Sequence, residues 1–159
     1  MGGSAAGGEF LSTLSDLEGN LPIKVNRNYD LPTWWNNEWL VIATSYSGNT
    51  EETIAASEKV LKQDGTLIGL CSGGELAGIC EMEENAHLCL IPGGQPPRSA
   101  FGHLFGTQLA IVWEVGIIQR PSDTELQQMI SRIEQYISLY DFTQNKNSEV
   151  STLANAMEQ

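Results

Sequence analysis

The chain has 159 residues, the length of one ordinary domain, and 41% of them are hydrophobic, which is enough to bury a core. This composition excludes wholesale disorder. The formal net charge of -12 opposes binding to nucleic acid or to an anionic membrane, because such partners need Lys and Arg. A small phosphorylated ligand is not excluded, since a local pocket can hold an anion with backbone N–H groups and one arginine.

No segment of the given sequence predicts export or membrane insertion. The opening residues MGGSAAGGEF lack the basic segment and apolar core of a secretory signal, and no run approaches about 20 apolar residues. Cys71, Cys80 and Cys89 are odd in number, and their spacings match no CxxC pair or zinc pattern. We interpret them as small buried hydrophobes, and we expect a soluble, cytoplasmic protein.

The first predicted elements follow an opening glycine-rich loop that runs into an apolar helix start. Residues 21–29 (LPIKVNRNY) alternate apolar and polar side chains, which predicts a short strand. The continuous apolar run over 38–45 is typical of a strand buried on both faces of a parallel sheet. Residues 49–65 have helical spacing, an acidic first turn and a closing glycine, so they predict a helix.

Two more strands and a helix are predicted in the middle of the chain. Residues 66–72 form the next apolar run, 74–85 favour a short helix, and 86–94 favour a strand that ends in a Pro-Gly-Gly turn. Strands that alternate with helices predict a parallel sheet with helices on both faces. In such folds ligands bind in the loops at the carboxyl ends of the strands.

Helices dominate the rest of the sequence. Residues 96–118 predict a long apolar helix with its prolines at the start, where they are tolerated. Residues 122–140 predict an amphipathic helix with Ser122 as its N-cap and Glu125 completing a capping box. The tail is polar, with a helical pattern only near its end.

The most informative stretch is ATSYSGNTEETI, residues 43–54, at the carboxyl end of a predicted strand. Hydroxyl groups of Ser45, Ser47 and Thr50 can donate hydrogen bonds to a phosphate. Gly48 lets the backbone approach, and a helix that starts near Asn49 directs free N–H groups at an anion. An ordinary strand-to-helix turn with a serine cap is the alternative. Neither GxxxxGK[ST] nor GxGxxG after a strand is present, which excludes a Walker loop and a dinucleotide fingerprint.

Four motifs, spread in order over about residues 1 to 118, resemble one family. SYSGNTEET resembles the phosphosugar-binding signature of the sugar isomerase (SIS) domain. MGGSAAGGEF, CSGGELA and IPGGQPPRSAFGHLFG resemble the bifunctional phosphoglucose/phosphomannose isomerases. The resemblance implies a three-layer α/β/α SIS domain with a five-stranded parallel sheet. It also implies two such domains in each chain, and a homodimer.

The resemblance also predicts how this chain is divided. Residues 1–120 would be an SIS domain without its first strand, which the family places inside the sheet before the position of Met1. Its loss would leave unpaired strand edges. Residues 121–159 would be a helical segment that leads to a second SIS domain, so we expect the chain to be a fragment.

The activity that the resemblance implies is aldose–ketose isomerisation of glucose 6-phosphate and mannose 6-phosphate to fructose 6-phosphate through an enediol(ate), without a metal or organic cofactor. Arg98 would stabilise the charge of the enediolate. The family's general base and ring-opening histidine lie in its second domain, so the chain alone is expected to be inactive. The implied phosphate ligands are Ser45, Ser47 and Thr50, and the other implied substrate contacts are Gly3, Ser4, Gly48 and Asn49.

Two other readings stay open. A lone SIS domain can serve as a non-catalytic phosphosugar sensor, although no DNA-binding segment accompanies this one. A structural protein without a ligand would leave the loop chemistry unexplained. His103 lies among apolar residues, which favours a core or interface histidine. The tryptophans of WWNNEW could stack on a sugar, but their place before a strand favours packing or an interface; they are Trp34, Trp35 and Trp39.

Overall fold

A computed structural model describes residues 3–141, 143 and 148–157. The chain divides into two compact units, Met1–Gln119 and Arg120–Gln159. None of the described helices is both long enough and apolar enough to cross a membrane.

The first unit is built on a parallel sheet of three strands, β1 (Val41–Thr44), β2 (Leu67–Cys71) and β3 (Ala86–Leu90), in the order β1-β2-β3. β2 pairs on both sides and is the most deeply buried strand, which explains its continuous apolar sequence. The predicted parallel α/β architecture is therefore confirmed.

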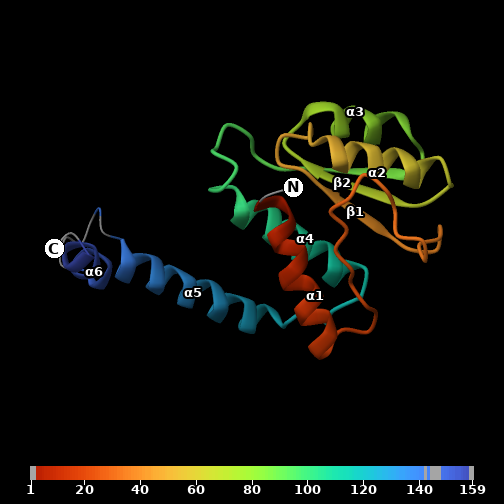
Figure 1. Cartoon of the computed structure of the whole chain (residues 1–159). Helices are drawn as coiled ribbons and strands as arrows, with labels where there is room; N and C mark the ends of the chain where they lie inside the picture. The colour runs from red at the N-terminus through yellow and green to blue at the C-terminus, as the bar shows by residue number, and fades with distance from the viewer. Residues whose placement is uncertain (1–2, 142, 144–147, 158–159) are drawn as a thin grey trace. The chain divides into compact units, whose positions relative to one another are not determined.

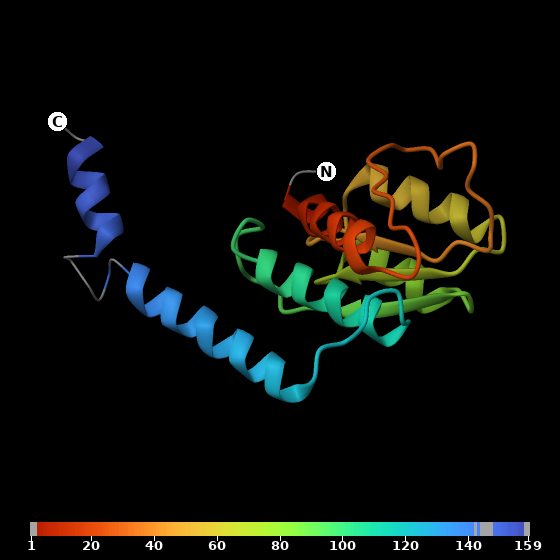
Figure 2. The same cartoon turned by 90° about the horizontal axis from the view of Figure 1, so that it is seen from below.

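Helices cover both faces of this sheet. α2 (Glu51–Leu61) and α3 (Gly74–Met82) lie on one face. α1 (Ala6–Glu18), which the 3-10 turn η1 (Gly3–Ala5) precedes, and α4 (Phe101–Glu114) lie on the other, as the two views show (Figures 1 and 2).

Alternate residues of the strands supply the two cores between these layers. The core under α2 and α3 contains Ala43, Val60, Leu67, Cys71, Leu76, Ala77, Cys80 and Ala86. Two clusters lie on the α1 and α4 side, one of Tyr46, Leu70, Ile91, Ala100 and Leu104 and one of Leu11, Val112 and Ile118.

The second unit contains α5 (Asp123–Tyr140) and α6 (Glu149–Met157). The predicted capping box is confirmed. The Glu125 N–H donates to Ser122 Oγ at 3.3 Å, and the Ser122 N–H donates to the Glu125 carboxylate at 2.9 Å. No described residue of either helix is buried.

Two sequence predictions need correction. Residues 21–29 form no strand, although they were predicted to be one. They run as an irregular segment that pairs with no strand of the described sheet, and a strand depends on its partner as much as on its own side chains. The helix predicted over 96–118 is shorter, Phe101–Glu114, because residues 96–99 form a turn in which the Ser99 N–H donates to the Pro96 carbonyl.

Candidate phosphate-binding site

The hydroxyl-rich loop lies where the sequence predicted, between the carboxyl end of β1 and the start of α2. Ser45 is fully buried. Its Oγ accepts the Gly48 N–H at 3.1 Å and lies 2.8 Å from Thr50 Oγ1. The buried hydroxyl therefore closes the loop on itself and fixes the position of Thr50.

Gly48 brings this loop against the next one. Its φ of 72° is in the left-handed region, and a Cβ built there would lie 1.8 Å from the carbonyl oxygen of Gly73. The Gly48 carbonyl accepts the Leu76 N–H from the first turn of α3. No larger side chain fits at this contact between the β1–α2 loop and the β2–α3 loop.

Ser47, Asn49 and Thr50 form the outer part of the loop. Ser47 and Asn49 are exposed and Thr50 is half-buried. The Asn49 N–H donates to Ser47 Oγ at 3.2 Å, and Asn49 Oδ1 accepts the Glu75 N–H at 3.0 Å, so the Asn49 side chain caps α3. The capping oxygen of Asn49 is thus engaged within the protein.

The start of α2 presents its first N–H groups beside these hydroxyls. Thr50 is the N-cap residue and its side chain makes no capping hydrogen bond, so the predicted serine cap is wrong, while an ordinary strand-to-helix turn stays the alternative to a phosphate site. Both acidic residues of the first turn act on Tyr29. The Tyr29 hydroxyl donates to Glu51 at 3.4 Å. The pKa of this phenol is raised, mainly by the negative charge of Glu52 and then by burial and by Glu51.

The opening glycine-serine motif reaches the same loop. Ser4 lies in η1, beside Gly3, and its Oγ accepts the Tyr46 N–H at 3.4 Å. The structure therefore brings together two segments that are 42 positions apart in the sequence. Gly3, Ser4, Ser47 and Thr50, all predicted site residues, lie at one end of the sheet.

Arg98 lies in the exposed connection between β3 and α4. This connection is held to the hydroxyl-rich loop through Tyr46, whose hydroxyl donates to the Pro92 carbonyl at 3.3 Å and accepts the Gln95 N–H at 3.0 Å. Tyr46 was not predicted from the sequence as a site residue. The one available signal was an aromatic residue with a hydroxyl group in the middle of SYSGNT.

His103 is not a core residue, so that part of the prediction is wrong. It is exposed on α4, and its Nε2 lies 3.1 Å from Gln95 Nε2. It faces solvent because Leu104 and Gln108 occupy the buried face of this helix. Whether it lies in an interface stays a prediction.

The tryptophans lie toward the opposite end of the sheet. Trp35 is half-buried and packs on the core under α2, close to Gly65 in the turn that precedes β2. The rings of Trp34 and Trp39 are 4.9 Å apart. Packing is therefore confirmed for Trp35, while Trp34 remains 52% exposed.

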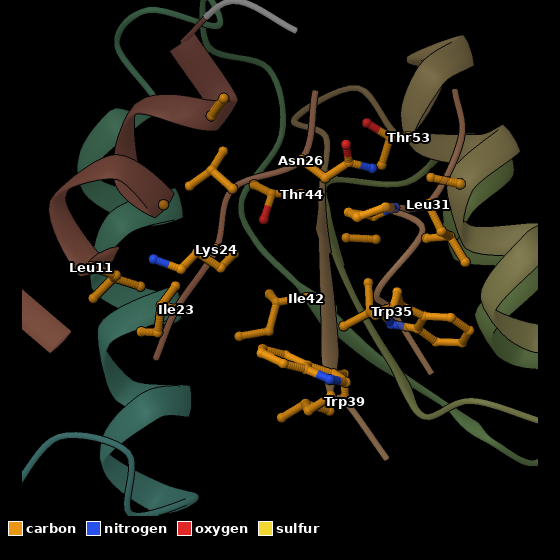
Figure 3. Close-up of a pocket in the computed structure, with 18 of the residues that line it drawn as sticks. Leu11, Ile23, Lys24, Asn26, Leu31, Trp35, Trp39, Ile42, Thr44 and Thr53 are labelled. Atoms are coloured by element: carbon orange, nitrogen blue, oxygen red, sulfur yellow. The ribbon is translucent and has the colours of Figure 1, made fainter. Parts of the chain in front are cut away.

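A pocket of about 240 Å³ in the first unit runs along the edge of β1 that faces away from β2. The Val41 N–H donates to Thr66, just before β2, and the Ser45 N–H donates to Leu70 of β2. The alternate residues Ile42 and Thr44 therefore direct their peptide groups to the other side. There the pocket separates β1 from residues 22–26. Figure 3 shows Ile42 and Thr44 on β1 and Ile23 and Lys24 on the facing segment.

Most of this pocket is apolar, unlike the hydroxyl-rich loop at its end. Its polar lining residues include Ser4, Thr44 and Thr53, together with Lys24 and Glu52. Gln108 Nε2 donates to Thr44 Oγ1 at 2.8 Å, whereas Gln108 Oε1 and Thr53 Oγ1 are buried and have no partner among the described residues. An apolar groove of this kind suits a hydrocarbon or peptide surface better than a sugar phosphate.

The three cysteines differ in burial. Cys71 and Cys80 are buried and free, as predicted, and Cys89 is half-buried. Burial raises the pKa of Cys71 and of Cys80, which keeps both as unreactive thiols at neutral pH. Among the residues that the structure describes, no group of three or more His, Cys, Asp or Glu could hold a metal ion.

Fold and site together define an α/β domain with a hydroxyl-rich loop at the carboxyl ends of its parallel strands, where ligands bind in such folds. No protein-family model matches the chain. Among curated relatives, the bifunctional phosphoglucose/phosphomannose isomerase of Caldicellulosiruptor bescii is 35% identical over 130 residues, which are 82% of this chain and 38% of that protein. The isomerase of the same name from Thermoplasma volcanium is 38% identical over 104 residues, 65% of this chain and 32% of that protein.

A relative with a different name is the D-glucosamine-6-phosphate 4-epimerase of Sulfolobus acidocaldarius, 35% identical over 111 residues, 66% of this chain and 33% of that protein. The chain belongs to the family of bifunctional phosphoglucose/phosphomannose isomerases. It spans about a third of the length of the curated relatives that it matches.

Proposed function

We propose that this chain binds the phosphate group of a hexose 6-phosphate in the loop Ser45–Thr50. The observation that carries the proposal is the arrangement of this loop: the hydroxyl groups of Ser47 and Thr50 lie at the start of α2, and the Thr50 hydroxyl, held 2.8 Å from the Ser45 hydroxyl, caps no N–H group of the helix. A phosphate held there accepts hydrogen bonds from the hydroxyls and from the first-turn N–H groups.

The names of the relatives support the same ligand class. Two different activities, isomerisation and 4-epimerisation, occur among them, and both names refer to phosphorylated hexoses. The shared requirement is a phosphate anchor, which the loop of this chain provides. Ser45 belongs to this site as a predicted ligand whose buried hydroxyl also shapes the loop.

The reaction that we propose is aldose–ketose isomerisation of glucose 6-phosphate or mannose 6-phosphate to fructose 6-phosphate. A base removes the proton from C2 of the open-chain aldose and a 1,2-enediolate forms. Return of a proton to C1, with transfer of the C2 hydroxyl proton to the C1 oxygen, gives the ketose, and the reverse steps give the aldose. Arg98 would place its guanidinium beside the phosphate and the enediolate oxygen, so that it attracts the bound substrate and stabilises more strongly the charge that forms on proton removal. The family resemblance places the base outside this chain, so the chain supplies binding and electrostatic stabilisation.

Binding is tested on the 159-residue chain by calorimetry with fructose 6-phosphate, and with fructose as the control that lacks the phosphate. Ser47→Ala should weaken fructose 6-phosphate binding by about 1–2 kcal/mol, as expected for a lost hydrogen bond to a charged group. Ser138→Ala, an exposed serine of α5, is the matched control and should leave the affinity unchanged. Equal affinity in wild type, Ser47→Ala and a triple Ser45, Ser47 and Thr50 alanine variant would reject the site.

Catalysis is tested in a chimera in which this chain replaces the matching residues of the Caldicellulosiruptor bescii isomerase. The chain alone should bind fructose 6-phosphate without turnover, and the chimera should interconvert the three sugar phosphates. Arg98→Ala in the chimera should lower kcat by about 10²–10³-fold and raise KM less. A normal kcat with a raised KM would restrict Arg98 to ground-state binding, and turnover by the chain alone would place a base within these residues. A chimera that binds fructose 6-phosphate without turnover would instead favour the non-catalytic phosphosugar sensor.

A further inference from the structure

Tyr46 is the point at which three loops of the proposed site meet. Its N–H donates to Ser4 Oγ at 3.4 Å. Its carbonyl accepts the Ser72 N–H at 2.8 Å and the Ser72 hydroxyl at 2.6 Å. Its side-chain hydroxyl joins Pro92 and Gln95. One residue therefore contacts the opening 3-10 turn, the β2–α3 loop and the β3–α4 connection.

The ring of Tyr46 is held as firmly as its polar groups. It is 7% exposed and belongs to the core cluster that contains Ile91 and Ala100. These two residues are the buried ends of the β3–α4 connection, and the Ile91 N–H donates to the Cys71 carbonyl. Between them, all residues except the half-buried Gln95 are exposed.

Few hydrogen bonds are described for the exposed part of the connection. Gln95 is held by the Tyr46 hydroxyl through its N–H and by His103 through its side chain. Arg98 follows in the turn that the Ser99 N–H closes onto the Pro96 carbonyl. Pro96 and Pro97 fix their φ angles, so the direction of the chain at Arg98 depends on where Gln95 is held.

We infer that Tyr46 is a positioning residue, whose hydroxyl holds the β3–α4 connection against the hydroxyl-rich loop and thereby places Arg98 for a ligand with its phosphate in that loop. Tyr46 itself touches no reacting atom, because its hydroxyl is directed to the backbone of Pro92 and Gln95. The placement of Arg98 for a ligand rests on the proposed function, whereas the anchoring of the connection does not.

Anchoring is tested by amide hydrogen exchange of Tyr46→Phe in the full chain. The Gln95 amide loses its acceptor and should exchange at least about tenfold faster. The Ser72 amide bonds to the backbone carbonyl of residue 46 and should keep its protection, which makes it an internal control for folding. Tyr29→Phe, which removes an exposed phenol, should change neither amide. An unchanged Gln95 amide would overturn the inference, and so would loss of protection at both amides, since the hydroxyl would then support the whole site.

Placement of Arg98 is tested by a double-mutant cycle on fructose 6-phosphate affinity. Arg98→Ala should weaken binding about tenfold in the wild-type background and less than about twofold in the Tyr46→Phe background, because there the arginine is already displaced. Equal effects in the two backgrounds would overturn the placement role. Absence of fructose 6-phosphate binding by the wild type would reject the proposed function and with it the placement of Arg98, but the exchange result would still decide the anchoring.

Discussion

Different interactions stabilise the two units of this chain. In Met1–Gln119, strands and helices far apart in the sequence bury side chains completely, and Leu67, Leu70, Leu76 and Val60 have no exposed surface. In Arg120–Gln159, α5 has a capping box and an apolar stripe, yet none of its residues is buried. Ile130, Ile133 and Ile137 are 49%, 56% and 63% exposed.

This difference separates tertiary from local stabilisation. A helix without a buried face gains little from burial, so its caps and propensities make up a large part of its stability. The strands of the first unit depend on partners that close over them. The same substitution should therefore have very different effects in the two units.

The largest expected effect is from Leu70→Ala in the central strand. Leu70 is fully buried in the cluster with Tyr46 and Ala100, so its removal should lower the free energy of unfolding of the first unit by about 3–5 kcal/mol. Leu139→Ala in α5 is the control and should change the free energy of unfolding of the first unit by less than about 0.5 kcal/mol, because Leu139 belongs to the other unit and is 48% exposed.

Tryptophan fluorescence in a urea titration measures the first unit alone. All four tryptophans lie there, at Trp34, Trp35, Trp39 and Trp113. Similar losses for the two leucine variants would contradict the division into a packed unit and a locally stabilised one.

The second effect in size is expected at the contact between the two site loops. Gly48→Ala combines a left-handed φ with a clash against the Gly73 carbonyl, so the loops must separate, at a cost of about 2–4 kcal/mol. Gly94→Ala is the control, since Gly94 has a φ of 83° but nothing lies within 4 Å of its added Cβ. It should cost about 1–2 kcal/mol, the conformational part alone. Equal costs in urea titrations would show that the loop contact adds nothing.

Local signals allowed much of the fold to be predicted from the sequence. The capping box of α5 depends on residues three apart, and the apolar runs of the three strands need no knowledge of their neighbours. The segment 21–29 was predicted wrongly because its alternation, although local, has no paired strand to complete it. The start of α4 was predicted too early because two prolines were placed inside the helix instead of before it.

The site was predictable in its residue types but not in its geometry. Ser47 and Thr50 are at the outer part of the loop, as a phosphate site requires, whereas the sequence gives no sign that Ser45 is buried. The contacts of Tyr46 reach residues 26 to 49 positions away, so no short motif reveals them. Long-range hydrogen bonds of this kind are set by the packing of loops that the sequence order keeps apart.

A smaller effect is expected from the cap of α5. Ser122→Ala should cost about 1 kcal/mol of helix stability, because the Glu125 N–H loses its acceptor. Amide exchange in the first turn of α5 should accelerate, while the fluorescence midpoint of the first unit stays unchanged. Ser138→Ala, in the last turns of the same helix, is the control. A shift of the fluorescence midpoint in Ser122→Ala would show that the two units do not respond independently.

The smallest effect concerns the pH dependence of that cap. The Ser122 hydroxyl, followed by the Ser122 backbone N–H, lowers the pKa of Glu125 below its ordinary value. The charged carboxylate is therefore favoured in the helix. The stabilisation that this carboxylate gives the helix is fully present above the pKa that Glu125 has in the unfolded chain. It is lost as the pH falls through the pKa that Glu125 has in the folded chain. Acidification should fray the first turn of α5. Amide chemical shifts in this turn, recorded as the pH is lowered, measure the fraying.

Glu125→Gln separates charge from hydrogen bonding in this cap. The amide oxygen of Gln can still accept the Ser122 N–H but does not titrate, so the first turn should become insensitive to acid. Glu134→Gln, in the middle of the same helix, removes an equal charge outside the capping box and should leave the acid response in place. If the first turn of Glu125→Gln frayed with acid as the wild type does, the response would come from other carboxylates, and the cap would not be the local device that distinguishes α5 from the packed elements of the first unit.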